Sequence, residues 1–187
     1  LYANDIPIDT AYLDKNKNFI FHLKITEGKL FNFETEGKYQ YVYIEPNDSV
    51  VVYANALRFD ESISFSGKGA AVNNYILQQS NEMDKQTELM KRFHTLPPIL
   101  YKETIDSLYE KKKQEYNTFL KSNPQLTDKA KNLLWVSAVF PIYKEMEVYP
   151  FMYQDKNRSS MLQQLPADFY NYRKDINYND VFLEYFR

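Results

Sequence analysis

The sequence predicts an α+β protein in which an N-terminal antiparallel β-sheet or small sandwich is followed by an α-helical region. In the first third of the chain, apolar and polar residues alternate in short runs, which is typical of strands with one buried face. After about residue 70 glycine is absent, and long segments rich in Lys, Glu, Gln, Leu and Met follow, which favours helices. We therefore expect a β-rich part over residues 1–68 and a helical part over residues 69–187, packed as one unit.

The β-rich part is expected to contain a series of short strands. Phe19, Phe21, Leu23 and Ile25 share one face of the run 18–25, which indicates an amphipathic strand. Turn residues then separate the later runs, as antiparallel neighbours require. The further strands are expected over residues 29–35, 39–45, 49–53 and 63–65.

Three long helices are expected in the second part. The first covers about residues 70–93 and stops before Pro97-Pro98, and the second covers about residues 100–120. Thr127 is a suitable N-cap for a third helix, which is apolar on nearly all sides and is therefore expected to be the most buried. Two shorter aromatic-rich segments follow, over residues 168–174 and 180–186.

Composition excludes several classes of function. The chain has 187 residues, and its 23 basic and 25 acidic side chains give a net charge of −2, so no overall field attracts nucleic acid or anionic lipid. The absence of cysteine excludes disulfides, thiolate metal sites and a CxxC redox pair in this chain. Its longest apolar run, residues 133–140, is too short to span a bilayer.

The glycine-containing stretch from Phe65 to Leu77 lies where a phosphate-binding loop would lie, between a strand and a helix. A P-loop requires GxxxxGK followed by Ser or Thr, and a dinucleotide loop requires GxGxxG. Here Gly67-Lys68-Gly69 is followed by two alanines, and Val72 occupies the position of the third glycine. We therefore expect a structural strand-to-helix connection with no cofactor, in which glycine supplies unusual backbone angles.

The remaining polar motifs are interpreted as structural or solvated. The two histidines, His22 and His94, have no paired spacing, so a metal site is not expected. The basic run Lys111–Lys113 has acidic neighbours and is typical of a solvated helix face. No catalytic residue is predicted, although paired carboxylates leave an uncharacterised hydrolase as an alternative. These acidic pairs are Glu34 with Glu36, Asp60 with Glu61, and Glu145 with Glu147.

Tyr39, Tyr41 and Tyr43 alternate along one expected strand, whose other face carries Val42 and Ile44. Both faces of this strand are therefore apolar, so the face that does not pack in the sheet core must be covered by another element or by a ligand. Helices of the same chain are one interpretation. The alternative is a binding surface for sugar, for peptide or for another domain.

Two motifs carry a resemblance to a known family. Pro46-Asn47-Asp48 between strands, followed by Phe65-Ser66-Gly67-Lys68-Gly69 and Asn73 at a helix start, resembles the N-terminal region of TlpA/ResA-like, thioredoxin-like thiol:disulfide oxidoreductases from Bacteroidetes. Residues 165–170 are similar to a later helix start in that region. Asn47 replaces the family's usual glycine and, like glycine, accepts a positive φ.

The resemblance implies a non-catalytic accessory module of an envelope oxidoreductase. It implies that a thioredoxin-like domain with a Trp-Cys-x-x-Cys motif follows Arg187 in the parent chain, and that this domain or its protein client is the partner. It also implies a periplasmic or cell-envelope location, with a lipid anchor upstream of Leu1. A stand-alone carbohydrate- or peptide-binding module that uses the tyrosine face is the alternative.

Overall fold

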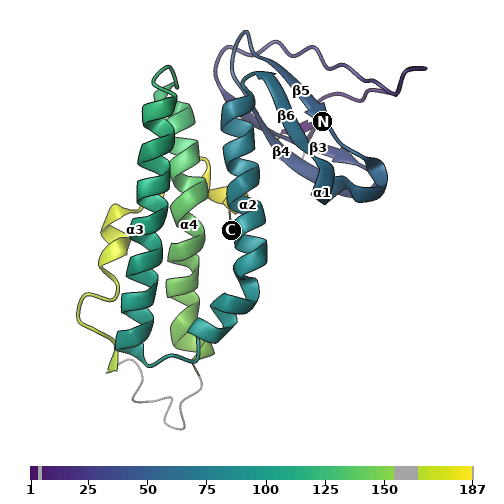
Figure 1. The fold of residues 1–187 in the computed structure, drawn as a ribbon. Helices are drawn as coiled ribbons and strands as arrows, with labels where there is room; N and C mark the ends of the chain where they lie inside the picture. Colours follow the sequence, from purple (N-terminus) through teal and green to yellow (C-terminus); the bar gives the residue numbers. More distant parts are fainter. Residues whose placement is uncertain (4–5, 154–163, 187) are drawn as a thin grey trace. The chain divides into compact units, whose positions relative to one another are not determined.

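The computed structural model describes residues 1–3, 6–153 and 164–186, and its order of elements confirms the α+β class (Figure 1). The chain divides into two compact units, Leu1–Leu77 and Gln78–Arg187. The sequence-based division at residue 68 falls just before a long helix, whereas the division in the structure falls within that helix. We refer to the two parts as the β unit and the helical unit.

The β unit contains a four-stranded antiparallel sheet with the order β2-β1-β3-β4 and a second antiparallel pair, β5-β6. Thr35 of β3 pairs with Lys38 of β4, so the hairpin loop consists of Glu36 and Gly37, which have φ values of 49° and 73°. Two positive φ values are typical of the hairpin turn that matches strand twist. The strands are β1 (Tyr2–Ala3), β2 (Ile6–Pro7), β3 (Lys29–Thr35), β4 (Lys38–Ile44), β5 (Ser49–Tyr53) and β6 (Ser64–Lys68).

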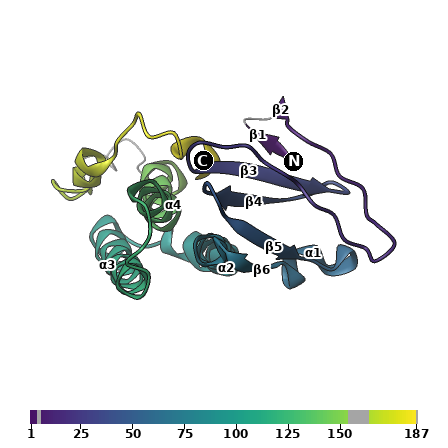
Figure 2. The ribbon, with the colours of Figure 1, turned by 90° about the horizontal axis from the view of Figure 1, so that it is seen from above.

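An apolar core joins the two sheets, which Figure 2 shows as separate layers. Phe31, Phe33 and Val42 contribute from the four-stranded sheet, and Phe65 contributes from β6. Between β5 and β6 the chain forms two short helices, η1 (Ala56–Arg58) and α1 (Phe59–Ser62). Phe59 of α1 is buried in the same core, so this small sandwich is closed by side chains from both layers and from their connection.

The strand predicted over residues 18–25 is absent from the ladders of the described chain. Its alternation of faces is nevertheless present, because Phe19, Phe21, Leu23 and Ile25 pack against the core while the residues between them are exposed. Phe19 stacks on Phe33 with ring centroids 5.2 Å apart. The alternation of apolar and polar residues therefore identified the buried face correctly. A segment can bury one face, however, without pairing its backbone with a neighbouring strand.

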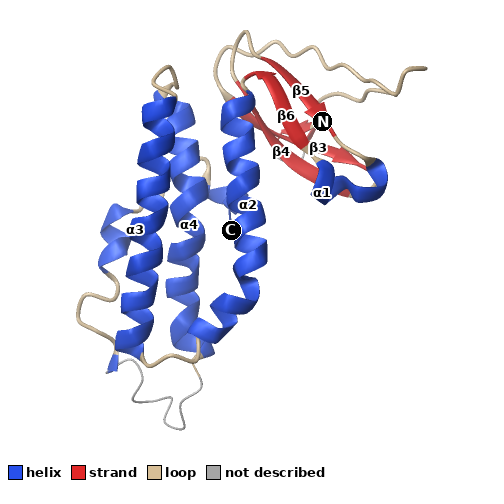
Figure 3. Ribbon diagram, viewed as in Figure 1, coloured by secondary structure: helices blue, strands red, loops and turns tan. Residues whose placement is uncertain are grey.

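Three long helices follow, and all of them were predicted (Figure 3). Proline occupies the first position of the second helix, where its missing N–H costs no hydrogen bond. Thr127 caps the third helix by accepting a hydrogen bond from the Ala130 N–H at 3.1 Å. That helix continues through Pro141 and Pro150. The helices are α2 (Ala70–Phe93), α3 (Pro98–Ser122) and α4 (Asp128–Met152).

The core of the helical unit is formed largely by α4, the helix that is apolar on nearly all sides. Tyr101 of α3 and Tyr149 of α4 are fully buried and stack with centroids 3.7 Å apart. Their hydroxyls donate to the carbonyls of Glu145 and Leu96 respectively. The aromatic segments after α4 form 3-10 helices, η3 (Asn171–Asp175) and η4 (Leu183–Phe186). In the part of the chain that the structure describes, no helix has the length and apolar character needed to cross a membrane.

Candidate functional site

The tyrosine face of β4 is graded in exposure from one end to the other. Tyr39 is 59% exposed, Tyr41 is half-buried and Tyr43 is only 1% exposed. Tyr39 and Tyr41 meet edge to face with centroids 5.8 Å apart, whereas the Tyr43 hydroxyl donates to Glu45 Oε1 at 3.0 Å. Tyr43 is thus part of the interior, and the surface available to a ligand reduces to the outer two rings.

The turn after β4 is a hydrogen-bonded β-turn. The Asp48 N–H donates to the Glu45 carbonyl at 3.1 Å, and Pro46 and Asn47 fill the two central positions. Asn47 has a φ of 65°, which corresponds to a type II turn, with proline first and a left-handed residue second. The Asp48 carboxylate then accepts a hydrogen bond from the Glu45 N–H at 2.9 Å, so the turn is fixed by its own side chain.

Two consecutive asparagines at the start of α2 bind the edges of both sheets. Asn73 accepts a hydrogen bond from the Tyr43 N–H at 2.7 Å and donates to the Tyr43 carbonyl at 2.8 Å. Asn74 makes the same pair of bonds to the N–H and carbonyl of Phe65 in β6, at 3.1 and 2.9 Å. Each side-chain amide bonds to the strand edge as a residue of a neighbouring strand would. The start of α2 therefore covers the edge of β4 at Tyr43 and the edge of β6 at Phe65.

The glycines of this strand–helix joint permit its close packing. Gly67 and Gly69 have φ values of 81° and 95°. A Cβ at Gly69 would lie 2.5 Å from the Asp48 carboxylate, and one at Gly67 would lie 2.2 Å from the Ser49 carbonyl. Because Asp48 lies against Gly69 and the Lys68 ammonium donates to the Asn47 carbonyl at 3.0 Å, the two motifs that carry the family resemblance meet in one place.

In two of the acidic pairs considered as catalytic candidates, the two carboxylates lie in different local environments. Glu34 lies on β3, but Glu36 lies in the hairpin turn. Glu145 interacts with His94 Nε2 at 2.8 Å, while Glu147 accepts hydrogen bonds from Tyr172 and Arg173. The Arg173 hydrogen bonds, more than the one from Tyr172, hold the pKa of Glu147 below its usual value. No cluster of three potential metal ligands occurs among the described residues.

The interpretation of Lys111–Lys113 as a solvated face is wrong for Lys112. Its side chain is 5% exposed and donates to Gln79 Oε1 at 2.9 Å and to Glu82. Successive helical residues point about 100° apart, so one member of a basic run can face a neighbouring helix. Burial raises the pKa of Glu82, but the hydrogen bond and charge of Lys112 outweigh it and lower the pKa overall.

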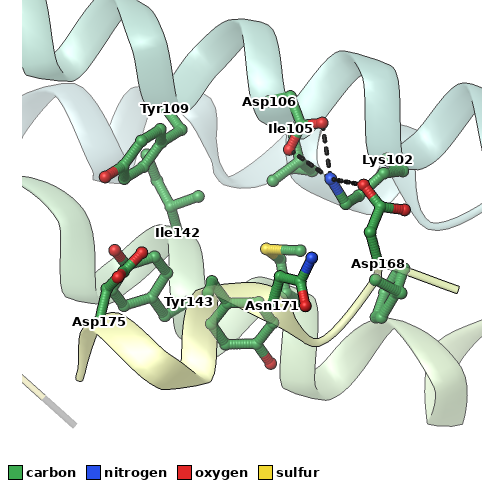
Figure 4. Close-up of a pocket in the computed structure, with 12 residues that line it drawn as sticks. Lys102, Ile105, Asp106, Tyr109, Ile142, Tyr143, Asp168, Asn171 and Asp175 are labelled. Atoms are coloured by element: carbon green, nitrogen blue, oxygen red, sulfur yellow. Dashed lines mark hydrogen bonds and ion pairs between the residues drawn. The ribbon is translucent and has the colours of Figure 1, made fainter. Parts of the chain in front are cut away.

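The helical unit contains a pocket of about 170 Å³ that the sequence did not predict (Figure 4). It lies where α3, α4 and the segment around η3 meet. Lys102 and Asp106 come from α3, whereas Asp168 and Asp175 come from the C-terminal segment. The partners are separated by more than sixty positions in the sequence, so spacing gave no signal. The remaining lining residues are Ile105, Tyr109, Ile142, Tyr143, Met146, Phe169, Asn171 and Tyr172.

The two ends of this pocket differ in charge pairing. At one end the Lys102 ammonium donates to both Asp106 oxygens, at 2.9 and 2.7 Å, and lies 3.4 Å from Asp168. Burial lowers the pKa of Lys102, but these two carboxylates outweigh it and raise the pKa overall. Figure 4 shows Tyr109, Tyr143 and Asp175 at the other end. Within the described chain, Asp175 makes no ion pair.

The fold and these sites define an α+β protein with a hydrogen-bonded strand–helix joint and a small pocket with charged ends in its helical unit. The comparisons with models of protein families, with curated proteins and with solved structures gave no match for the chain.

Proposed function

We propose that this chain is a non-catalytic accessory module of a cell-envelope, thioredoxin-like thiol:disulfide oxidoreductase, which positions the redox domain or binds its client. The observation that carries the proposal is the joint in the β unit. Asp48 of the first resemblance motif packs against Gly69 of the second, and Asn73 binds both β4 and Gly69. Motifs separated in sequence but joined in space support a resemblance better than either short motif does alone.

The chemistry of the joint is consistent with an accessory role. The polar side chains of Asp48, Asn73 and Asn74 are engaged with backbone groups. A chain without cysteine supplies no thiolate for disulfide exchange, so the redox step of the proposed parent protein belongs to another domain. The module would work in the periplasm or cell envelope.

The direct test is the coding sequence on both sides of this chain. The proposal expects a lipoprotein or secretory signal upstream and a thioredoxin-like domain with a CxxC motif downstream. The parent protein should reduce a model disulfide substrate such as insulin, and this chain alone should not. A reading frame that ends near Arg187, or one that continues without any CxxC domain, would refute the proposal.

A second candidate is a stand-alone carbohydrate- or peptide-binding module, which the exposed Tyr39 and its contact with Tyr41 favour. Exposed aromatic rings are suited to stacking on sugar rings or peptide groups. Glycan-array binding that is lost in Tyr41→Ala would support it. Tyr53→Ala is the matched control, because Tyr53 is 64% exposed on a different strand, β5.

A further inference from the structure

We propose that the pocket of the helical unit binds a primary alkylammonium or guanidinium group, such as the end of a lysine or arginine side chain. This inference deepens the proposed function and rests on it, since it assigns the chemistry by which the module would hold a client. It is argued from the lining residues alone, all of which belong to the helical unit.

The charges that line the pocket favour a cation. The lining contains three carboxylates, those of Asp106, Asp168 and Asp175, but only one ammonium, that of Lys102. One carboxylate in excess would already attract a positive ligand, and here there are two. An anionic ligand would have to compete with Asp106 and Asp168 for the only cation in the lining.

One end of the pocket already holds an alkylammonium group, its own Lys102. Its Nζ atom is held by both oxygens of Asp106 and by Asp168, and the side chain is only 14% exposed. A charged amine between two carboxylates and partly removed from water is therefore compatible with this lining. The same arrangement keeps Lys102 from serving as a free anion-binding group.

The other end has the groups that a second cation needs but does not contain one. Asp175 is exposed and makes no ion pair in the described part of the chain. The Tyr143 side chain is 4% exposed, and its hydroxyl has no hydrogen-bond partner of regular geometry among the described residues. Figure 4 shows this ring beside Asp175. Tyr109 interacts with this hydroxyl, whose oxygen still has a lone pair for an N–H donor from a ligand.

The remaining walls suit the apolar stem of such a ligand. Tyr109 and Tyr172 both stack on Tyr143, with centroids 6.0 and 5.1 Å from it, and aromatic faces attract cations. Ile105 and Met146 complete an apolar floor. The volume of about 170 Å³ resembles that of engineered cavities of about 150 Å³ that hold benzene, which is comparable in size to a lysine side chain.

The test is an NMR titration of the chain with n-butylammonium and n-butylguanidinium, with butyrate and n-butanol as anionic and neutral analogues. We expect saturable shifts at the amides of Tyr143, Asn171 and Asp175 for the two cations, with affinity falling as salt is added. Asp175→Asn should weaken cation binding roughly fivefold, as loss of one exposed charge partner does. Tyr143→Phe should weaken it as well.

Glu103→Gln is the matched control, because this exposed carboxylate lies on α3 but not in the pocket lining, and it should bind like the parent chain. Equal shifts with butyrate or butanol, or unchanged cation affinity in Asp175→Asn, would overturn the inference. The coding-sequence test is independent of this result. A chain that precedes a CxxC domain but does not bind cations would refute the pocket assignment and leave the accessory role standing.

Discussion

Replacing Asn73 by alanine should destabilise the β unit more than any other single amide deletion at its joint. Asn73 is completely buried and makes three hydrogen bonds, two with Tyr43 and one with the Gly69 carbonyl. In the alanine variant, the N–H and carbonyl of Tyr43 lose their partners in a place that water does not reach.

The magnitude follows from these three bonds. A hydrogen bond contributes about 1 kcal/mol net, and a buried group left without a partner costs about 1–3 kcal/mol. We therefore expect Asn73→Ala to lower the unfolding free energy of the β unit by about 3–5 kcal/mol. Asn74→Ala is the matched control, because Asn74 makes the same two bonds to Phe65 from an exposed position, where water can replace them. Its cost should be about 1 kcal/mol.

The assay must distinguish the two units. The only tryptophan, Trp135, lies on α4 in the helical unit, so its fluorescence does not report directly on the β unit. Native-state hydrogen exchange does, since the Tyr43 N–H is protected by Asn73 itself. Exchange at β3 and β4 should accelerate strongly in Asn73→Ala, while urea unfolding followed by Trp135 should move much less. Equal effects of the two asparagine variants on β4 exchange would refute the reasoning.

Three further outcomes are expected. Gly69→Ala should cost at least about 2 kcal/mol by hydrogen exchange of the β unit, whereas Gly37→Ala, which also has a positive φ but has open space around it, should cost only about 1 kcal/mol. Lys112→Met should lower the urea stability of the helical unit by about 2–4 kcal/mol, and the exposed Lys111→Met should leave it nearly unchanged. The lowered pKa of Glu147 means that its contribution is complete above the unfolded value of about 4.5 and is lost as pH falls through the folded pKa. Glu147→Gln should therefore flatten the fall in stability between about pH 5 and 3.

The helices could be predicted closely because their limits are set by local chemistry. The first long helix ends at Phe93, ahead of Pro97, Pro98 begins the next helix, and Thr127 caps the third. These signals act within one turn and do not depend on the rest of the fold. The turn at Pro46-Asn47 could be predicted for the same reason, since proline and a left-handed residue specify it locally.

The strand pairing could not be predicted in the same way. The alternation in residues 18–25 specifies which side chains are buried, and Phe19 and Phe21 are packed accordingly. Whether the backbone of that segment forms a ladder depends on which edges remain free elsewhere. At β4 and β6 the amides of Asn73 and Asn74 occupy edge positions. Edge pairing is decided by tertiary neighbours, which periodicity does not encode.

The sequence did not predict the pocket or the buried Lys112, because the residues next to a charged side chain in the sequence do not identify a partner from a distant segment. Lys102 lies beside Asp106 on one helix, a spacing that a sequence presents as an ordinary surface pair. Only the return of the chain after α4 brings Asp168 to the same ammonium and Asp175 to the far end of the pocket. The same helix surface would be solvated without that segment. Its aromatic residues, which the sequence did reveal, therefore convert a surface ion pair into one wall of a pocket: Phe169 anchors the segment in the core, and Tyr172 stacks on Tyr143.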